Sequence, residues 1–349
     1  MVRVIHLSPV RPDFQTQRSL EYLRRDLGAD GSALTLGPGG DVRNVPMAAI
    51  ALRRLLRRGA EVVHAWGPSA LAAAVLGGCR QIIYSPLPDS PTRTSRWFGA
   101  AAAGHCFRVV CPSEAMRRTL VEQGVAAERC QVIHPPVDFA RVPSSRNALL
   151  RAELGFAESD RVTLLPGEST RSTSHRAGVW ALSILYVMEE SERVLVWGRG
   201  RQAESLVRFG KRLAQHNLVT LAEQRLGQAV DFEQLTAVAD AAVVPAQGDA
   251  AAVLPLLICM AAGLPIVSGF TPAAAEFLQD RQTALVIAPA TPKTLAQGIM
   301  ELRQNPALRR HLAESARAKA KALYDLPKFL DQWRCTYLAM GDRAVSVRV

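Results

Sequence analysis

A chain of 349 residues is long for a single hydrophobic core, and about two domains are expected. Its composition, 48% hydrophobic and 21% charged, excludes a disordered chain, and no apolar run reaches the ~18 residues of a membrane-spanning helix. The N-terminal "MVRVIHLSPV" reads as a strand and lacks a signal-peptide pattern, so we expect a cytoplasmic protein.

The formal net charge is +11, and most of the excess lies in the first 150 residues. The arginines are scattered and not interleaved with aromatic residues, so no nucleic acid partner is expected. One dense cluster, "LRRLLRR" at residues 52–58, fits either a solvated helix face or peripheral contact with the inner face of a membrane. The six cysteines form no C-x-x-C pair and no zinc spacing, so we expect buried thiols and no metal.

Strand and helix patterns alternate through the first half of the chain. Short apolar runs predict strands at residues 3–9, 32–37, 61–67 and 81–86, and two more that start near 108 and 130. Helical spacing with glycine stops predicts helices at residues 15–28, 46–59 and 68–78, and another before 125. We assign residues 1–142 to one domain and residues 143–160 to a linker with a short helix.

A second alternating series follows from residue 161. Strands are expected at residues 161–167, 193–198, 218–224, 241–247, 264–269 and 284–290, with helices at 176–189, 201–215, 231–240 and 253–263. A pair of helices is expected over 291–324. We therefore assign residues 161–325 to a second domain and residues 326–349 to a final helix.

Strands that alternate with helices of 10–15 residues are typical of parallel sheets covered on both faces. The expected fold class is α/β, with two doubly wound, Rossmann-like domains. Ligands of such sheets bind beyond the carboxyl ends of the strands, so the expected site is a cleft between the two domains.

Several segments resemble the GT-B glycosyltransferases of the retaining family-4 (glycosyl transferase group 1) type. They are "RVVCPSEAMRRTLVEQGVAAERCQVIHPPVDF" and "LTAVADAAVVPAQ…LPLLICMAAGLPIVSG", with the closing "YDLPKFLDQWRCTYLAM". The resemblance implies transfer of a sugar from a nucleotide-sugar, with retention, to a glycan or lipid-linked acceptor. It also implies that residues 1–142 form the acceptor-side domain and residues 161–325 the donor-side domain. It implies no metal cofactor, and a last helix that crosses back to the first domain.

The family's pair of glutamates is replaced. Anchoring on "MAAGLP" places Ala250 and Ile258 at the two positions, with Asp249 a stand-in for the first glutamate if the register shifts by one. The second carboxylate is expected to hold the ribose hydroxyls, and isoleucine has no hydrogen-bond acceptor with which to do so. Ile258 is therefore interpreted as helix core.

The family's diphosphate-binding segment corresponds to "PGESTRSTSHRAG". Gly167 matches, Glu168 stands where an arginine is expected, and Arg171 or Arg176 could supply the missing charge. The alternative interpretation of this run is a polar loop with a helix N-cap. A helix N-terminus attracts anions in either case.

Of the other positions that the family uses, some match in this sequence and some are replaced. The glycine-rich loop after the first strand is replaced by "SPVRPDFQTQ", and Leu87 stands where a histidine is expected. Gly198 lies in a Gly-x-Gly turn that matches the family, and Glu276 matches a glutamate at the start of a helix, as a sugar-donor contact or a helix-terminus charge. His64 is interpreted as a structural histidine.

The scaffold positions match while the usual ligand-binding positions are altered. One hypothesis is an active glycosyltransferase with an unusual sugar-donor site. The alternative is a non-catalytic homologue that serves as a binding, scaffold or regulatory protein. A third hypothesis places the protein at the membrane surface, acting on lipid carriers through "LRRLLRR".

Overall fold

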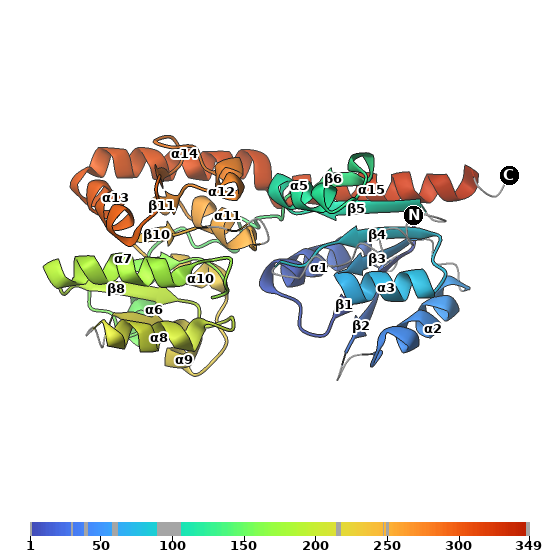
Figure 1. Cartoon of the computed structure of the whole chain (residues 1–349), viewed down its shortest axis with the longest axis horizontal. Helices are drawn as coiled ribbons and strands as arrows, with labels where there is room; N and C mark the ends of the chain where they lie inside the picture. The colour runs from blue at the N-terminus through green and yellow to red at the C-terminus, as the bar shows by residue number, and fades with distance from the viewer. Residues whose placement is uncertain are drawn as a thin grey trace. The chain divides into compact units, whose positions relative to one another are not determined.

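A computed structural model of the chain describes residues 2–28, 31–37, 41–57, 62–88, 106–213, 218–246, 248 and 251–346. These residues form two compact units. Unit 1 comprises Met1–Pro136 with Pro327–Val349, and unit 2 comprises Val137–Leu326. Each unit is described by itself, and Figure 1 shows the elements of both.

Unit 1 is built on a six-stranded parallel sheet with the order β2-β1-β3-β4-β5-β6. Its strands are β1 Val4–Pro9, β2 Gly31–Leu36, β3 Val62–Trp66, β4 Gln81–Ser85, β5 Cys106–Cys111 and β6 Cys130–Val132. Its helices are α1 Phe14–Leu27, α2 Val45–Leu56, α3 Pro68–Leu76, α5 Glu114–Glu122, the short 3₁₀ helix η2 Ala127–Arg129 and α15 Leu326–Ser346. The helices α2 and α3 pack together on one face of the sheet, and α1 and α15 lie on the other (Figure 1).

Unit 2 repeats this architecture with the order β12-β11-β10-β7-β8-β9, again all parallel. Its strands are β7 Arg161–Leu165, β8 Glu192–Val196, β9 Val219–Leu221, β10 Ala241–Val244, β11 Ile266–Gly269 and β12 Leu285–Ile287. Its helices are α6 Ala148–Glu153, α7 His175–Met188, α8 Ala203–Arg212, α9 Ala222–Leu226, α10 Phe232–Thr236, α11 Leu254–Ala261, α12 Pro272–Phe277, α13 Pro292–Gln304 and α14 Pro306–Tyr324. The helices α7, α8 and α13 cover one face of the sheet, while α10, α11 and α14 cover the other.

The expected α/β class with two doubly wound, Rossmann-like sheets is confirmed. Apolar runs such as "RVTLL" are buried along almost their whole length because helices cover both faces of a parallel sheet. Helix starts follow the side-chain caps of the sequence: Asp13 accepts a hydrogen bond from the backbone N–H of Thr16 at 3.1 Å, where α1 begins.

Several predicted strands were too long, and in one of them a helix takes the place of the second half. Residues 218–224 were expected to be extended, but β9 ends at Leu221 and α9 begins at Ala222. The short helix stops at Gly227, which adopts the left-handed conformation with φ 67°. The alternation of apolar residues alone could not show where the strand gives way to this single helical turn.

The cysteine prediction is partly confirmed. Cys79, Cys111 and Cys259 are buried free thiols, and burial raises the pKa of the Cys79 thiol to about 12. Cys130 is half-buried, and Cys335 is exposed on the last helix.

Among the described residues, no group of three or more His, Cys, Asp or Glu side chains could hold a metal ion. No helix in the described part of the chain has the length and apolar character needed to cross a bilayer.

Candidate functional site

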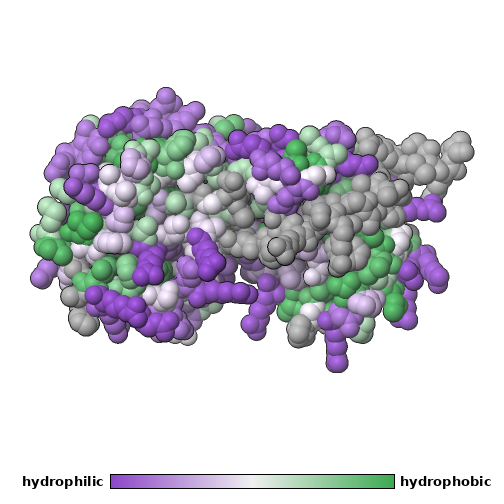
Figure 2. All heavy atoms as spheres, in the orientation of Figure 1, coloured by the Kyte–Doolittle hydropathy of each residue, from purple (hydrophilic) through white to green (hydrophobic). Residues whose placement is uncertain are grey.

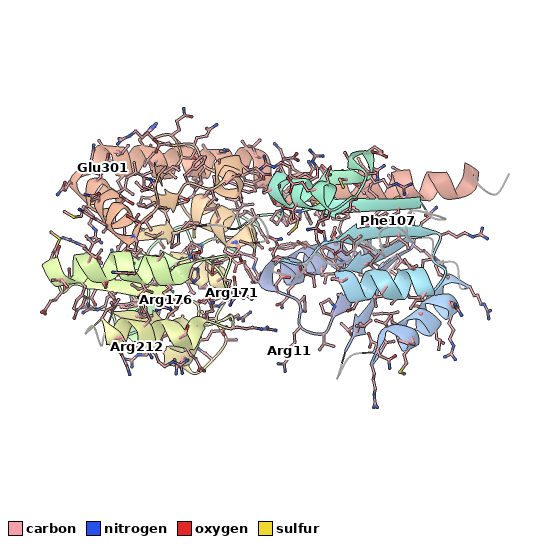
Figure 3. The ribbon with its side chains drawn as sticks, viewed as in Figure 1. Arg11, Phe107, Arg171, Arg176, Arg212 and Glu301 are labelled. Carbon is pink, nitrogen blue, oxygen red and sulfur yellow. The ribbon has the colours of Figure 1, made fainter. Side chains whose placement is uncertain are left out.

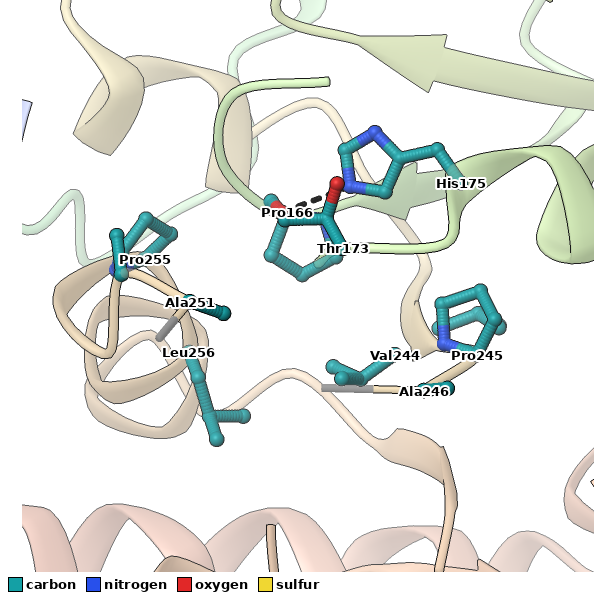
Figure 4. Close-up of a pocket in the computed structure, with 11 residues that line it drawn as sticks. Pro166, Thr173, His175, Val244, Pro245, Ala246, Ala251, Pro255 and Leu256 are labelled. Atoms are coloured by element: carbon teal, nitrogen blue, oxygen red, sulfur yellow. Dashed lines mark hydrogen bonds between the residues drawn. The ribbon is translucent and has the colours of Figure 1, made fainter. Parts of the chain in front are cut away.

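Unit 2 has a pocket at the point where its strand order reverses. The chain leaves β7 for β8 on one side and returns to β10 on the other, so β7 and β10 are neighbours at the switch point. The pocket encloses about 300 Å³, a volume that includes space open to solvent. Pro166 and Thr173 line it from the loop after β7, Pro245 and Ala246 from the end of β10, and Pro255 from α11 (Figure 4).

The loop between β7 and α7 is closed by His175, the first residue of α7. Its Nε2 lies 3.0 Å from the carbonyl oxygen of Pro166 (Figure 4), and its Nδ1 lies 3.0 Å from the hydroxyl of Ser169. A carbonyl can only accept, so Nε2 carries the proton and Nδ1 accepts from Ser169. Burial lowers the pKa of His175 to about 4, and the ring is therefore neutral near pH 7.

Backbone hydrogen bonds hold the same loop against the turn that follows β8. The N–H of Ser169 donates to the carbonyl of Arg199 at 2.8 Å, and the Ser169 carbonyl accepts from the N–H of Gln202 at 3.0 Å. A Cβ atom on Gly200 would lie 2.5 Å from the nitrogen and oxygen of Ser169. Gly200, with φ 95°, is therefore a position where only glycine fits both the turn and the contact.

In the described loop between β7 and α7, the backbone and one arginine could attract an anion. None of the described side chains that line the pocket is charged at pH 7. The N-terminus of the 14-residue helix α7 begins at His175, and its free N–H groups favour an anion. Arg171, in the loop before α7, is exposed and makes no side-chain hydrogen bond or ion pair with the described residues (Figure 3).

Unit 1 has a second pocket, of about 340 Å³ with space open to solvent, at the carboxyl edge of its own sheet. Trp66 ends β3, Ser85 ends β4, and both line the pocket with Thr16 from the first turn of α1. The last helix supplies Phe329 and Trp333. The pocket lies wholly within unit 1.

A network of buried rings lies beside this second pocket. His64 and Trp66 point to the same face of β3 and stack with ring centroids 4.2 Å apart. His64 Nδ1 lies 2.8 Å from the hydroxyl of Tyr337, and its Nε2 lies 2.9 Å from the hydroxyl of Ser85. Burial lowers the pKa of His64 well below its ordinary value, so it is neutral and hydrogen-bonded on both sides.

Two family models match the chain, one on each side of its middle. "Glycosyltransferase Family 4" matches residues 2–141, and "Glycosyl transferases group 1" matches residues 179–305. Together they cover more than half of the chain. The chain belongs to the GT-B glycosyltransferases.

Solved structures share the fold of this glycosyltransferase over its whole length. HepE of Anabaena, in a complex with UDP-glucose, is 17% identical with a TM-score of 0.80, covering 97% of this chain and 100% of its own. A glycosyltransferase of Rickettsia africae is 13% identical (TM-score 0.76, 97% and 98%), and sucrose-phosphate synthase of Thermosynechococcus elongatus is 14% identical (0.75, 97% and 99%). No curated protein sequence matches the chain significantly. At these identities the likeness establishes the fold.

The two arginines that were expected to bind the phosphates of the nucleotide-sugar lie on different elements of this glycosyltransferase. Arg171 is in the loop, whereas Arg176, the second residue of α7, places its guanidinium 4.3 Å from the ring centre of Phe209 on α8 (Figure 3). Gly167 adopts φ 86° and packs against α11, because a Cβ there would lie 3.1 Å from Pro255 Cγ. Glu168 is half-buried in the same loop.

Two further predicted positions, Gly198 and Glu276, lie in other loops and helices of unit 2. Gly198, with φ 107°, precedes Arg199, whose side chain pairs with Glu223 at 2.8 Å. Glu276 was expected at the start of a helix, but α12 starts at Pro272 and Glu276 lies in its last turn. Pro272 at the first position and the cap at Thr271 shift the helix start upstream, so the interpretation of Glu276 as an N-terminal charge is wrong.

The remaining altered positions are filled by apolar packing. Ile258 is 2% exposed within α11, whose residues are all buried, and its interpretation as helix core is confirmed. Leu87 packs on Gly67 at the start of α3, where a Cβ would lie 2.6 Å from Leu87 Cδ1. Asp249 and Ala250 lie outside the described residues.

Sequence reasoning missed the two side chains that organise the loop after β7. His175 and Ser169 stand in the quoted run "PGESTRSTSHRAG" but were not singled out. A signal was available, because a histidine at the first position of an apolar helix is an uncommon residue to bury there. The aromatic partners Trp333 and Tyr337 could not be found from sequence, since they reach His64 from more than 260 residues away.

Proposed function

We propose that this protein transfers a sugar from a nucleotide-sugar with retention, and that the nucleotide-sugar binds at the unit 2 pocket. The bond between the anomeric carbon and the diphosphate oxygen breaks, and the acceptor oxygen bonds to the same face of the sugar. The acceptor proton passes to the departing diphosphate. The proposed reaction uses no metal ion. Relatives in fold have been solved with UDP-glucose and with UDP and a glycan ligand, which supports a nucleotide-sugar and a glycan or lipid-linked acceptor here.

The observation that carries the proposal is the ordered loop at the switch point. Its backbone is held by contacts within the protein, through Ser169, Gly200 and His175, and it leads into the N-terminus of α7. Preorganised N–H groups stabilise negative charge that develops on a leaving diphosphate. Since His175 is neutral, the only described cation of this loop is Arg171, and we assign the phosphate contact to it.

A non-catalytic homologue is the second candidate function, and Ile258 favours it. The whole of α11 is buried, and it presents no carboxylate that could hold a ribose. Losing one charge-assisted hydrogen bond weakens ligand binding by roughly 1.5–3 kcal/mol. A protein of this kind would keep the fold as a binding, scaffold or regulatory surface.

Turnover distinguishes the two functions. Purified protein is incubated with UDP-, GDP- and ADP-linked hexoses and an extract of neutral glycans and lipid-linked glycans, and released nucleoside diphosphate is measured with the anomeric configuration of the product. The proposal expects one donor to be consumed with retention, at a rate lowered at least ten-fold in Arg171→Ala and little changed in Arg176→Ala. Inversion, or no release from any donor, contradicts it.

Peripheral contact with an anionic membrane is proposed through the exposed surface of α2 and α3. Met47 and Ile50 on α2 and Leu76 on α3 are 46%, 51% and 44% exposed, and Arg54 and Arg57 lie beside them. Figure 2 shows hydrophobic side chains gathered over α2 and α3, with hydrophilic side chains projecting at the edge. A basic residue near an anionic bilayer contributes about 1 kcal/mol. The proposed location is therefore cytoplasmic, at the inner face of the membrane.

Vesicle co-sedimentation tests this contact. Vesicles with 30% phosphatidylglycerol should carry the protein down at low salt, and Arg54→Glu with Arg57→Glu should release it. The matched control is Arg208→Glu with Arg212→Glu, on the exposed face of α8 in unit 2 (Figure 3 labels Arg212). Equal loss in both double variants, or no binding by the unaltered protein, contradicts a contact through α2.

A further inference from the structure

Helix α7 of unit 2 has large apolar side chains on an exposed face. Trp180, Val187 and Met188 are all exposed, and Val187 is 76% exposed. At about 100° per residue, Trp180 and Val187 lie within about 20° of each other around the helix axis, so they share one face, which Met188 borders. Arg176 lies on the same face, nearer the start of the helix. Apolar side chains gathered on one exposed helix face are typical of an interaction surface.

The charges at the ends of α7 oppose its own dipole. Arg176 lies in the first turn, and Glu189 and Glu190 directly follow the last helical residue, Met188. The first turn contains no acidic residue, and the last turn contains no basic residue. A helix dipole favours carboxylates at the N-terminus and cations at the C-terminus. These charges are therefore better placed beside a second helix that runs in the opposite direction.

The cation and the indole of this face are held side by side. The guanidinium of Arg176 lies 4.3 Å from the ring centre of Phe209 on α8, and the edge of Trp180 packs against the same ring with centroids 6.4 Å apart (Figure 3 labels Arg176). Side chains that are ordered in advance lose less entropy when a partner binds. At the other end of the helix, Glu189 pairs with Arg161, whereas Glu190 is exposed.

We propose that α7 pairs antiparallel with α7 of a second copy of this chain, across a twofold axis. The sequence of the helix is complementary to itself. Arg176 and Glu190 lie equally far along the chain from Ser183, and Trp180 and Val187 lie almost equally far from it. An antiparallel pair centred there sets each Arg176 beside Glu190 of the other copy, and each Trp180 beside Val187. A twofold interface requires this kind of self-complementary surface.

Charge disfavours the other occupants of this face. A parallel pair would bring Arg176 beside Arg176 and Glu190 beside Glu190, and like charges across an interface repel. An anionic membrane would meet the two carboxylates at the end of α7. A second copy of the chain supplies both the acidic and the basic end that the helix requires.

Sedimentation velocity between 1 and 100 μM tests the pairing. A single pair of helices buries less surface than most stable interfaces, so we expect a reversible dimer with a dissociation constant on the order of micromolar. Val187→Glu places a charge in the apolar centre and should weaken the dimer at least about ten-fold. The matched control is Leu149→Glu on α6, at an apolar position that is 80% exposed, and it should leave the dimer unchanged.

A charge swap tests the antiparallel arrangement. Arg176→Glu and Glu190→Arg should each weaken the dimer at least about five-fold, because each variant sets like charges together at two symmetric places. The double variant should restore it to within about two-fold of the unaltered protein, since the pairs form again with their signs reversed. The altered side chains are exposed, so the unfolding midpoint at 1 μM should move little in every variant.

Three results would overturn the proposal. The first is a protein that stays monomeric up to 100 μM, in which case the exposed face of α7 serves another partner or none. The second is a dimer that Val187→Glu and Leu149→Glu weaken equally. The third is a double charge variant that dimerises no better than either single variant.

Discussion

His175 connects the chemistry of one residue to the stability of the unit 2 loop. Its ring is wholly buried and hydrogen-bonded to Pro166 and Ser169. Burial lowers its pKa from 6.5 to about 4, so between these values the unfolded chain binds a proton that the folded chain does not. The contribution to stability is complete above pH 6.5 and is lost as the pH falls towards 4.

The first prediction follows from this proton. The free energy of unfolding should fall by roughly 3 kcal/mol between pH 6.5 and pH 4 on account of His175 alone. His175→Gln keeps a donor for Pro166 and cannot titrate, so urea unfolding at several pH values should show a shallower fall. His311→Gln, at an exposed position, serves as the control. If the free energy of unfolding fell equally steeply with pH in the unaltered protein and in His175→Gln, the role assigned to the ring would be refuted.

Gly200 gives the second prediction. Gly200→Ala places a Cβ within 2.5 Å of the Ser169 backbone, so we expect a loss of roughly 3 kcal/mol or more and displacement of the loop. Gly227 also has a positive φ, with no atom within 4 Å of an added Cβ, and Gly227→Ala should cost only about 1 kcal/mol. Chemical denaturation of the two variants measures the difference. Similar costs would mean that backbone strain, and not the contact with Ser169, explains both.

At the scale of elements, the buried side chain of Arg151 connects α6 to the residues that precede β7 and β10 in unit 2. Arg151 is 4% exposed and donates to the carbonyl of Val238 at 2.7 Å and to those of Ala157 and Asp160. It also pairs with Asp240 at 3.3 Å. A buried charge with such partners is costly to remove, because its acceptors stay behind unpaired.

The third prediction compares two arginines that share Asp240. Arg151→Met should lower the free energy of unfolding by about 3–5 kcal/mol. Arg146, which pairs with Asp240 at 2.9 Å, is 50% exposed, and Arg146→Met should cost no more than about 1 kcal/mol. Denaturant unfolding measures both. A small effect at Arg151 would show that α6 is not fastened through this side chain.

The sequence predicts elements well where the chain repeats a local pattern. Buried runs such as "VVHAW" and glycine stops such as Gly28 mark real strand and helix ends. Local patterns cannot predict the role of a residue that depends on a contact with a distant part of the chain. Gly200, which lies against Ser169, and His64, which bonds to Tyr337, are two such residues. The position of Arg176 on Phe209 likewise depends on how α7 and α8 pack, which no motif encodes.

At the scale of the whole molecule, the two units share a six-stranded, all-parallel sheet, although the order of the strands differs between them. Each sheet reverses its order once, and a pocket lies at the carboxyl edge of each. Alternation of strands and helices was sufficient to predict two such sheets. It could not predict that the described lining of both pockets would lack charge, because that depends on which side chains meet at each edge.

The central claim is that a nucleotide-sugar binds at the loop after β7 despite the loss of the usual carboxylate and arginine. The most direct test is the unfolding midpoint of the purified protein, titrated with UDP, GDP, ADP and their sugar conjugates. A nucleotide at 100 times its dissociation constant should stabilise the fold by about 2.7 kcal/mol, and Arg171→Ala should need at least ten-fold more of it for the same shift. No shift with any of them at millimolar concentration would contradict the claim and favour the non-catalytic function.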